Sequence, residues 1–244
     1  MTFIVGDIHG EIEKLRNLIQ IILNIDKQAS FIFIGDYLDK GDNPLAVIQY
    51  LQELQQSNDC VFLLGNHEHL WINYTKETVE IANYLLKYGG TATIKSLGCN
   101  NIETASQILN TEFGAFFMQL KKFHYYKGYL IVHSGISSVA NNAKNLNEVD
   151  EKEFLFNRYD FLKTASLYKN QYKIVFGHTA FYSPYYDGFK IGIDTAACFL
   201  NNQPLTAFNA DEAYFIDSNQ SKLLLSHLSN IYLPNIVRVS SWTN

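Results

Sequence analysis

The 244-residue sequence has few cysteines, no long apolar run and no excess of basic residues, and each absence excludes a class of protein. Its three cysteines (Cys60, Cys99 and Cys198) are an odd number at irregular spacing, without a CxxC pair. We therefore expect reduced thiols rather than a disulfide framework. No apolar run approaches ~18 residues, and residues 1–5 lead directly into a strand pattern, without the charged and apolar regions of a signal peptide. These features predict a soluble, cytoplasmic protein without a membrane partner.

The charge balance argues against a nucleic-acid partner. The net charge is −5, whereas proteins that bind a phosphate backbone usually present a basic surface. The hydrophobic fraction of 47% and the charged fraction of 18% are ordinary for a globular protein with a sizeable core. No repeat, low-complexity tract or convincing linker divides the chain, so we predict a single domain over residues 1–244.

Short apolar runs recur along the chain, and each one ends in polar residues. Three of them, at 3–5, 31–34 and 61–64, alternate with two helical patterns in the first 65 residues. Runs of β-branched and aromatic residues without polar alternation indicate strands that are buried on both faces. Their alternation with helices predicts right-handed βαβ units. Two later runs, at 129–132 and 174–176, have the same form.

The rest of the chain divides into a helical part and a strand-rich part. Residues 69–128 lack a strong strand signal and predict a mainly helical cap over the edge of the sheet. From about residue 171, strand patterns follow one another closely, at 190–193, 213–216, 222–225 and 236–239, which predicts a more antiparallel second half. The predicted fold class is α/β, a sandwich of mixed central β-sheets flanked by helices with a helical cap insertion.

Five polar motifs directly follow the apolar runs: Gly6-Asp7-Ile8-His9-Gly10, Gly35-Asp36, Gly65-Asn66-His67-Glu68, His133-Ser134-Gly135 and Gly177-His178-Thr179. In open α/β sheets, ligands gather beyond the carboxyl ends of the strands, so strands packed in one core would bring these motifs together. The candidate metal ligands delivered in this way are Asp7, His9, Asp36, Asn66, His133 and His178. Carboxylate, amide and imidazole groups without a thiolate suit hard or borderline ions such as Mn²⁺, Fe or Zn²⁺.

The motif series closely resembles a known family. GDIHG (6–10), GDYLDKG (35–41), GNHE (65–68), HSG (133–135) and GHT (177–179) resemble, in order and approximate spacing, the phosphoprotein-phosphatase family of metallophosphoesterases. The segments KYGGTATIKSLG (87–98), FNRYDFL (156–162) and IDTAACFLNNQPLTA (193–207) are similar to its compact bacterial, serine/threonine protein phosphatase-like members. The resemblance covers about residues 1–215 and implies a calcineurin-like sandwich and a phosphoric ester hydrolase.

Specific roles follow from the resemblance, position by position. It implies two divalent metal ions, with Mn²⁺ expected and Fe or Zn as alternatives, one held by Asp7, His9 and Asp36. The other would be held by Asp36, Asn66, His133 and His178, so that Asp36 bridges. The same resemblance implies His67 as the general acid, oriented by Asp39, and Lys40, Arg158 and the Asn66 amide as phosphate contacts. Two such cations lower the pKa of a bridging water, which attacks phosphorus directly, and a histidine beside a carboxylate can protonate the leaving oxygen.

One departure from the family pattern bears on the substrate. Lys40 stands where the family usually has arginine, and lysine lacks the planar fork that holds phosphate with two hydrogen bonds. Some members that split dinucleoside polyphosphates or related pyrophosphate bonds carry lysine there, but those members tend to lose the carboxylate partner of the acid, and this chain keeps Asp39. We therefore favour a phosphomonoesterase that acts on a phosphorylated protein (at serine, threonine or tyrosine) or on a small phosphorylated metabolite. The alternatives are a dinucleoside polyphosphate hydrolase and an inactive binding scaffold.

Overall fold

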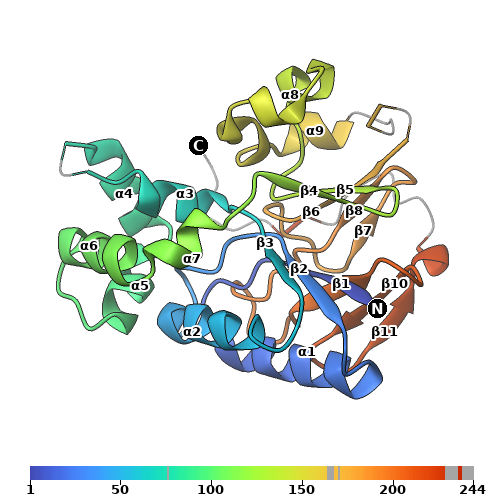
Figure 1. The fold of residues 1–244 in the computed structure, drawn as a ribbon, viewed down its shortest axis with the longest axis horizontal. Coiled ribbons are helices and arrows are strands. Elements are labelled where there is room, and N and C mark those ends of the chain that lie inside the picture. Colours follow the sequence, from blue (N-terminus) through green and yellow to red (C-terminus); the bar gives the residue numbers. More distant parts are fainter. Residues whose placement is uncertain (76, 164–167, 170, 229–235, 238–244) are drawn as a thin grey trace.

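The computed structural model describes residues 1–75, 77–163, 168–169, 171–228 and 236–237, and these form two stacked sheets between layers of helices (Figure 1). Within these residues, one sheet has the strand order β11-β10-β9-β1-β2-β3 and the other has the order β4-β5-β6-β8-β7. The strands of the first sheet are β1 (Thr2–Val5), β2 (Ser30–Phe33), β3 (Cys60–Phe62), β9 (Thr206–Asn209), β10 (Tyr214–Asp217) and β11 (Lys222–Leu224). Those of the second are β4 (Phe123–Tyr126), β5 (Tyr129–Val132), β6 (Lys173–Phe176), β7 (Tyr185–Tyr186) and β8 (Lys190–Gly192).

The pairing confirms the predicted mixed sheets. Strands β1, β2 and β3 are parallel, and so are β5, β6 and β8, whereas β9, β10 and β11 pair antiparallel. Strands β4 and β7 were not predicted from the sequence; each pairs antiparallel at an outer edge of the second sheet. Of the strand predicted at 236–239, Ile236 forms a single bridge with Phe181, and residues 238–239 lie outside the described part.

Each central strand contributes side chains to two cores. In β1, Ile4 points into the space between the sheets, where it joins Ile32, Ile131 and Val175. Its neighbours Phe3 and Val5 belong instead to the core beneath the helices. Because successive side chains of a strand point to opposite faces, a strand covered on both faces must be apolar at every position. The unbroken apolar runs in the sequence are the consequence of this four-layer arrangement.

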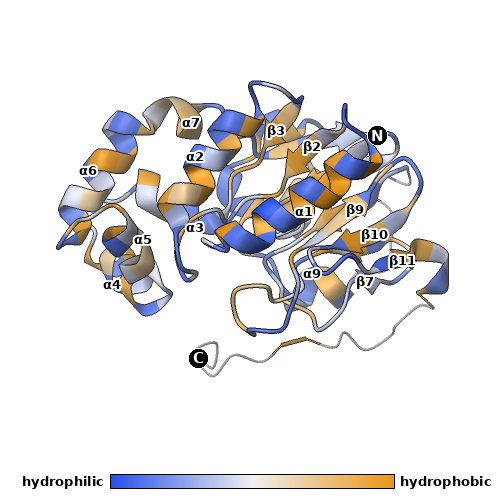
Figure 2. Cartoon of the chain, turned by 90° about the horizontal axis from the view of Figure 1, so that it is seen from below, coloured by the Kyte–Doolittle hydropathy of each residue, from blue (hydrophilic) through white to orange (hydrophobic). Residues whose placement is uncertain are grey.

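Helices α1 (Ile12–Ile25) and α2 (Pro44–Leu54) cover the outer face of the first sheet, opposite the second sheet (Figures 1 and 2). The buried stripe of α1 includes Leu15, Leu18 and Ile22, and Figure 2 shows apolar and polar residues alternating around this helix. Asn43 caps α2, because its side-chain oxygen accepts a hydrogen bond from the Ala46 N–H at 3.1 Å. These two crossover helices therefore lie on one face of the first sheet and connect the parallel strands β1, β2 and β3.

Further helices extend from the side of the first sheet: α3 (Asn66–Ile72), α4 (Val79–Lys87), α5 (Gly90–Ser96), α6 (Ile102–Glu112) and α7 (Gly114–Met118). We refer to α4–α7 as the helical segment; it lies within the predicted cap, whose last residues form β4. Short helices α8 (Ser138–Asn142) and α9 (Tyr159–Lys163), with 3₁₀ turns at Leu146–Glu148 and Glu151–Phe154, cover the second sheet. A last 3₁₀ turn spans Leu225–His227. In the described part of the chain, no helix combines the length and apolarity that crossing a membrane requires.

Gly89 joins the helical segment to the loop that follows β2. It has φ +104°, and its carbonyl accepts a hydrogen bond from the Lys40 N–H at 3.1 Å. A Cβ at this position would lie 2.7 Å from Lys40 Cγ and 2.8 Å from Lys40 N, which is too close for any side chain. The end of α4 is therefore fixed against the backbone of Lys40.

We expect Gly89→Ala to lower the free energy of unfolding by about 2–5 kcal/mol, as the sum of backbone strain and overpacking. Gly98→Ala is the matched control, because Gly98 also has a positive φ (+69°) but a Cβ there would meet no described atom within 4 Å beyond its own chain neighbours. This control should lose only about 1–2 kcal/mol, the strain contribution alone. Urea denaturation measures both variants, and equal losses would show that the contact with Lys40 contributes nothing.

Candidate active site

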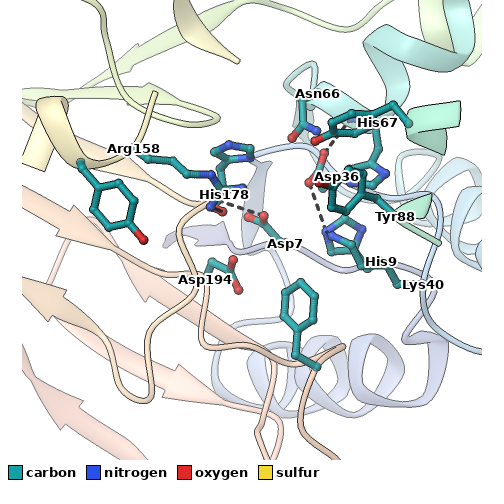
Figure 3. Close-up of a pocket in the computed structure, with 13 residues that line it drawn as sticks. Asp7, His9, Asp36, Lys40, Asn66, His67, Tyr88, Arg158, His178 and Asp194 are labelled. Atoms are coloured by element: carbon teal, nitrogen blue, oxygen red, sulfur yellow. Dashed lines mark hydrogen bonds and ion pairs between the residues drawn. The ribbon is translucent and has the colours of Figure 1, made fainter. Parts of the chain in front are cut away.

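The carboxyl ends of the parallel strands converge on one cavity of about 300 Å³ (Figure 3). Its lining residues come from loops that follow strands of both sheets and from helices α3, α4 and α9: Asp7, His9, Asp36, Lys40, Asn66, His67, Tyr84, Tyr88, Arg158, Tyr159, His178, Asp194 and Phe199. Two residues predicted at the site, Asp39 and His133, lie directly behind this lining and are fully buried. The structure therefore brings all the predicted site residues to one place.

The backbone around the cavity is unusual at several of these residues. His9, Asp36 and His178 have φ values of 45°, 54° and 61°, in the left-handed region that non-glycine residues rarely adopt. Asp39 and Lys40 have φ values of 67° and 65°. Each such residue costs on the order of 1–3 kcal/mol and persists only when the surrounding structure fixes it. These conformations occur in the loops that follow β1, β2 and β6 and carry the site residues.

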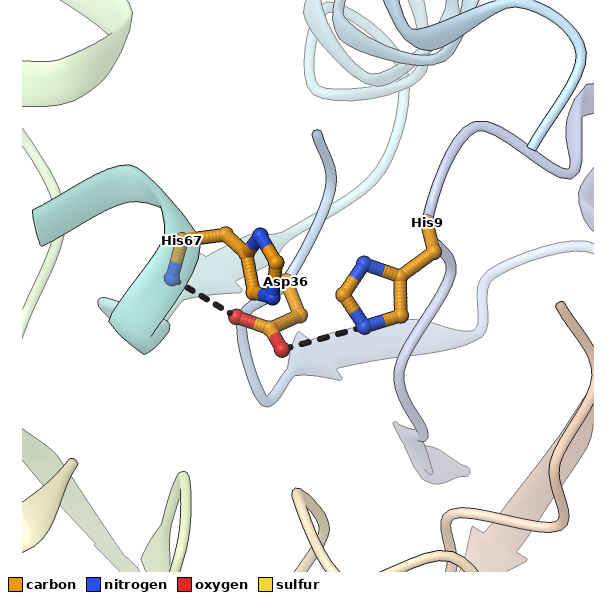
Figure 4. Close-up of side chains that lie close together, drawn as sticks. All are labelled: His9, Asp36 and His67. Atoms are coloured by element: carbon orange, nitrogen blue, oxygen red, sulfur yellow. Dashed lines mark hydrogen bonds and ion pairs between the residues drawn. The ribbon is translucent and has the colours of Figure 1, made fainter. Parts of the chain in front are cut away.

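Asp36 lies at the centre of the site, between two histidines that come from different sheets. Its Oδ2 atom is 3.1 Å from His9 Nε2, and its Oδ1 atom is 3.5 Å from His133 Nε2. Oδ1 also accepts a hydrogen bond from the His67 N–H at 3.1 Å (Figure 4). Burial alone would raise the pKa of Asp36, but the imidazoles of His133, His67 and His9 hold it well below its usual value. The Asp36 carboxylate thus directs Oδ2 toward His9 and Oδ1 toward His133.

The same two histidines are oriented by backbone carbonyls. His9 Nδ1 lies 2.8 Å from the Leu38 carbonyl oxygen, and His133 Nδ1 lies 2.9 Å from that of Ile34. A proton on each Nδ1 satisfies these contacts and leaves the Nε2 lone pairs directed into the site. Metal-binding histidines usually have their second nitrogen held in this way.

Asp7 contributes a carboxylate oxygen that no neighbour satisfies. Its Oδ2 accepts a hydrogen bond from the His178 N–H at 3.0 Å, whereas its Oδ1 is buried and has no partner among the described residues. Burial, followed by the charges of Asp194 and Asp36, raises the pKa of Asp7 well above its usual value. A Cβ on Gly177 would lie 2.0 Å from Oδ1, so only glycine admits the carboxylate here. A buried, unpartnered anionic oxygen beside other carboxylates fits a bound cation.

The donor atoms form two adjacent groups that could hold metal ions, and both groups contain Asp36. His9, Asp36 and His67 place donor atoms within 4.8 Å of one another, and so do Asp36, His133 and His178. Asn66 Oδ1 lies 3.0 Å from His133 Nε2, beside the second group. Asp7 belongs to neither group at this distance, although it lines the same cavity. The oxygen and imidazole donors fit divalent cations of the hard or borderline kind.

His67 is held by a buried carboxylate. Its Nδ1 lies 2.6 Å from Asp39 Oδ2, while Asp39 Oδ1 accepts hydrogen bonds from Trp71 Nε1 at 2.9 Å and Thr93 Oγ1 at 2.5 Å. Asp39 is wholly inaccessible to solvent. Its two donors belong to α3 and α5, so these helices fix the position of the carboxylate and, through it, the His67 ring. No sequence pattern indicated that Trp71 or Thr93 would contact Asp39.

Two cationic side chains border the cavity. Lys40 Nζ lies 2.6 Å from His9 Nε2 and 4.7 Å from the centre of the Phe199 ring. Burial, and then the Lys40 charge, lowers the pKa of His9 to about 4, so this imidazole is neutral at pH 7. On the opposite side, Arg158 donates a hydrogen bond to the His178 carbonyl at 2.7 Å (Figure 3). Both cations are therefore within the cavity, where they can face an anion.

Glu68 and His69 directly follow His67 in the chain, and both are buried. Glu68 accepts hydrogen bonds from the backbone N–H groups of Asp36, Tyr37 and Leu38, at 2.8, 2.9 and 3.0 Å. It therefore shapes the loop that carries Asp36. His69 Nδ1 lies 2.7 Å from Glu151 Oε1, which joins α3 to the 3₁₀ turn at Glu151–Phe154.

Some lining residues were not identified from the sequence. Asp194 comes two residues after β8, as Asp36 comes three residues after β2, so its position after a strand pattern was a usable signal. Burial raises the pKa of Asp194 to about 6. The aromatic lining residues carried no comparable signal. Tyrosines and phenylalanines are numerous in this sequence, so an aromatic side chain by itself does not indicate a site residue.

This combination of fold and site defines a class, an α/β sandwich with clustered aspartate and histidine donors at the strand ends. The calcineurin-like phosphoesterase family matches residues 2–210, and the chain belongs to this family. It is a metallophosphoesterase, an enzyme that hydrolyses phosphoric esters. The scaffold alternative is therefore set aside.

The chain is similar to proteins with two kinds of activity. It is 30% identical over 152 residues to the serine/threonine-protein phosphatase 2B catalytic subunit A2 of Saccharomyces cerevisiae, covering 59% of this chain and 21% of that subunit. It is 24% identical over 249 residues to an asymmetrical bis(5'-nucleosyl)-tetraphosphatase of Halalkalibacterium halodurans, covering 91% of this chain and 95% of that protein. The fold is also that of a cold-active protein-tyrosine phosphatase of a psychrophilic Shewanella, with a TM-score of 0.64 at 16% identity over 92% of this chain and 80% of that one.

Glu68→Gln tests the support behind Asp36. The amide keeps the size of the side chain but replaces one acceptor oxygen with a donor, which leaves at least one buried N–H without an acceptor. We expect the free energy of unfolding to fall by about 1–3 kcal/mol. The control Glu53→Gln, at an exposed position of α2, should change it by less than about 0.5 kcal/mol. Urea denaturation gives both values, and an unchanged stability of Glu68→Gln would refute a structural role for its carboxylate.

Proposed function

We propose that this chain is a phosphomonoesterase in which His67 donates a proton to the leaving oxygen. The observation that supports this most strongly is the buried Asp39–His67 pair, with 2.6 Å between Oδ2 and Nδ1. Hydrolysis of a phosphomonoester releases a basic alkoxide or phenoxide as the leaving group. Hydrolysis of a pyrophosphate bond releases a phosphate, which needs little protonation. A carefully held acid is therefore most useful for monoesters.

Metal binding forms part of the proposal. Asp7, His9 and Asp36 would hold one divalent cation, and Asp36, Asn66, His133 and His178 would hold another, with Mn²⁺ as the expected metal. Such cations supply a water nucleophile at neutral pH and neutralise the charge of the phosphate. The unpartnered Asp7 Oδ1 and the inward-facing Nε2 atoms of His9 and His133 support this assignment.

The remaining polar residues would position the phosphate. Arg158 and Lys40 border the cavity from opposite sides, and the Asn66 amide lies beside the second donor group, 3.0 Å from His133 Nε2. Arg158 can offer two parallel N–H groups to phosphate oxygens, while Lys40 offers a compact charge. Asp39 acts through His67, because it orients the imidazole and stabilises its protonated form. The substrate would be a phosphorylated protein or a small phosphorylated metabolite.

A dinucleoside polyphosphate hydrolase is the second candidate. The similarity to the bis(5'-nucleosyl)-tetraphosphatase of Halalkalibacterium halodurans extends over nearly the whole of both chains, which favours it. Lys40, in place of the arginine usual in the family, also favours it. The helical segment borders the cavity in either case, through Tyr84 and Tyr88, and would help to select the substrate.

His67→Asn tests the general acid. We expect kcat to fall on the order of 10²–10⁴ for alkyl phosphates such as phosphoserine, the usual loss for a positioned acid. The loss should be much smaller for para-nitrophenyl phosphate, because its phenolate leaves without a proton. Asp39→Asn should show the same dependence more weakly. The measurement is a rate series over leaving-group pKa, with metal content determined for each variant.

A uniform loss across that series, or a loss of bound metal, would mean that His67 is a ligand or a structural residue. The grouping of His67 with His9 and Asp36 makes this comparison necessary.

Lys40→Arg tests the choice between the two candidate functions. For a monoesterase, arginine should raise kcat/KM on phosphomonoesters, because the planar fork holds phosphate at two points. For a dinucleotide hydrolase, the exchange should shift the preference away from pyrophosphate bonds. Rates on phosphoserine and diadenosine tetraphosphate, measured on the same metal-loaded protein, distinguish the two. An unchanged rate on both substrates would remove Lys40 from the phosphate site.

A further inference from the structure

The catalytic cavity has two chemically different parts. Most of its lining consists of the charged and polar residues already assigned to the metals, the acid and the phosphate, together with Asp194. Every other described lining residue is aromatic: Tyr84, Tyr88, Tyr159 and Phe199. We refer to these four side chains as the aromatic wall. The part of a substrate that lies beyond its phosphate therefore meets aromatic rings, and the only polar groups of this wall are the phenol hydroxyls of its tyrosines.

Two of these rings stand beside the acid. Tyr84 lies on α4, and Tyr88 caps its carboxyl end one turn later. Their ring centres are 4.3 Å apart, and the ring planes are tilted by 42°. The Tyr84 ring centre is 6.4 Å from that of His67. The oxygen that leaves from phosphorus must lie within reach of His67, so the group attached to that oxygen lies against Tyr84.

Two residues of the aromatic wall are held against Lys40, in the loop that follows β2. Tyr88 precedes Gly89, whose carbonyl accepts the hydrogen bond from the Lys40 N–H. The centre of the Phe199 ring lies 4.7 Å from Lys40 Nζ and 6.4 Å from the centre of the His9 ring. These contacts fix Tyr88 and Phe199 relative to Lys40, which is proposed to contact the phosphate. A fixed distance between the aromatic rings and the phosphate allows the site to select among substrates.

The wall suits a flat ring attached directly to the phosphate oxygen. Planar rings pack favourably on tyrosine faces. A sugar phosphate would bury hydroxyl groups against apolar faces, which costs free energy when they lack partners. A nucleoside 5'-phosphate carries its ring one sugar further from phosphorus, so its sugar would lie closest to the leaving oxygen. The volume of about 300 Å³ is at the lower end of the range for small-molecule sites, which fits one ring and one phosphate.

We propose that Tyr84 and Tyr88 are specificity-determining residues that direct the enzyme toward phosphate esters of phenols, such as phosphotyrosine. This inference rests on the proposed monoesterase function. A tyrosine phenol has a pKa of about 10, so its oxygen still benefits from the proton of His67 at neutral pH.

Binding of non-hydrolysable phosphonates tests the inference without a contribution from leaving-group chemistry. Benzylphosphonate and cyclohexylmethylphosphonate have the same charge and similar size, and only the first has a flat aromatic ring. We expect Mn²⁺-loaded protein to bind benzylphosphonate about three- to tenfold more tightly in calorimetry, the gain typical of an aromatic pair. Tyr84→Leu and Tyr88→Leu should each reduce this ratio toward one.

Two further variants control for general effects. Tyr84→Phe keeps the ring and should keep the preference. Tyr74→Leu removes a tyrosine that lies outside the catalytic cavity and should leave the ratio unchanged. Equal binding of both phosphonates by the wild type would overturn the inference, as would an undiminished ratio in both leucine variants. The wild-type ratio decides even if a leucine variant does not fold.

A nucleotide ligand is the competing outcome. Tighter binding of adenosine 5'-monophosphate than of benzylphosphonate, with loss of this advantage in Tyr84→Leu, would overturn the inference in favour of a nucleotide. The proposed function is tested separately by turnover of phenyl phosphate and phosphoserine. Turnover without a ring preference rejects the inference alone. A ring preference in binding without turnover of either monoester rejects the monoesterase function, and with it the assignment of phenol phosphate esters as substrates.

Discussion

The buried Asp36 carboxylate between His9 and His133 is the interaction on which the rest of the site depends. It lies beside one histidine that follows a strand of the first sheet and one that follows a strand of the second, so the geometry of the site depends on how the two sheets stack. A carboxylate in this environment is stable only while cationic or hydrogen-bonding groups surround it. The neighbouring Asp7 and Asp194 have raised pKa values because burial and like charges oppose their ionised forms. Bound cations would relieve this accumulation of negative charge.

The protein supports this arrangement with structure that lies outside the cavity. Glu68 accepts three backbone N–H groups around Asp36, and Trp71 and Thr93 fix Asp39. Because these supports come from α3 and α5, the helices beyond β3 help to determine the geometry of the catalytic loops. The same attachment brings the tyrosines of α4 to the rim of the cavity. Selection of substrate and orientation of the acid are thereby connected through one group of helices.

Much of the fold followed from local patterns. The apolar runs of β1, β2, β3, β5 and β6 were predicted because a strand buried on both faces needs apolar side chains at every position. The polar motifs after these strands identified candidate site residues that the structure does bring together. Strands β4 and β7 were missed, since edge strands need not be continuously apolar. Their pairing depends on the neighbouring strands β5 and β8, which are adjacent to them only in the folded sheet.

The sequence by itself determined the family, the order of the strands that carry the motifs and the chemical nature of the donors, because each is encoded in a few adjacent residues. The tertiary structure alone decided which groups surround those donors. Nothing near Glu68 in the sequence indicates that it accepts the N–H groups of residues 36–38, and nothing near Tyr84 indicates that its ring lies beside His67. Such contacts join segments that are distant along the chain, and their geometry is set by the packing of helices and sheets rather than by any local pattern.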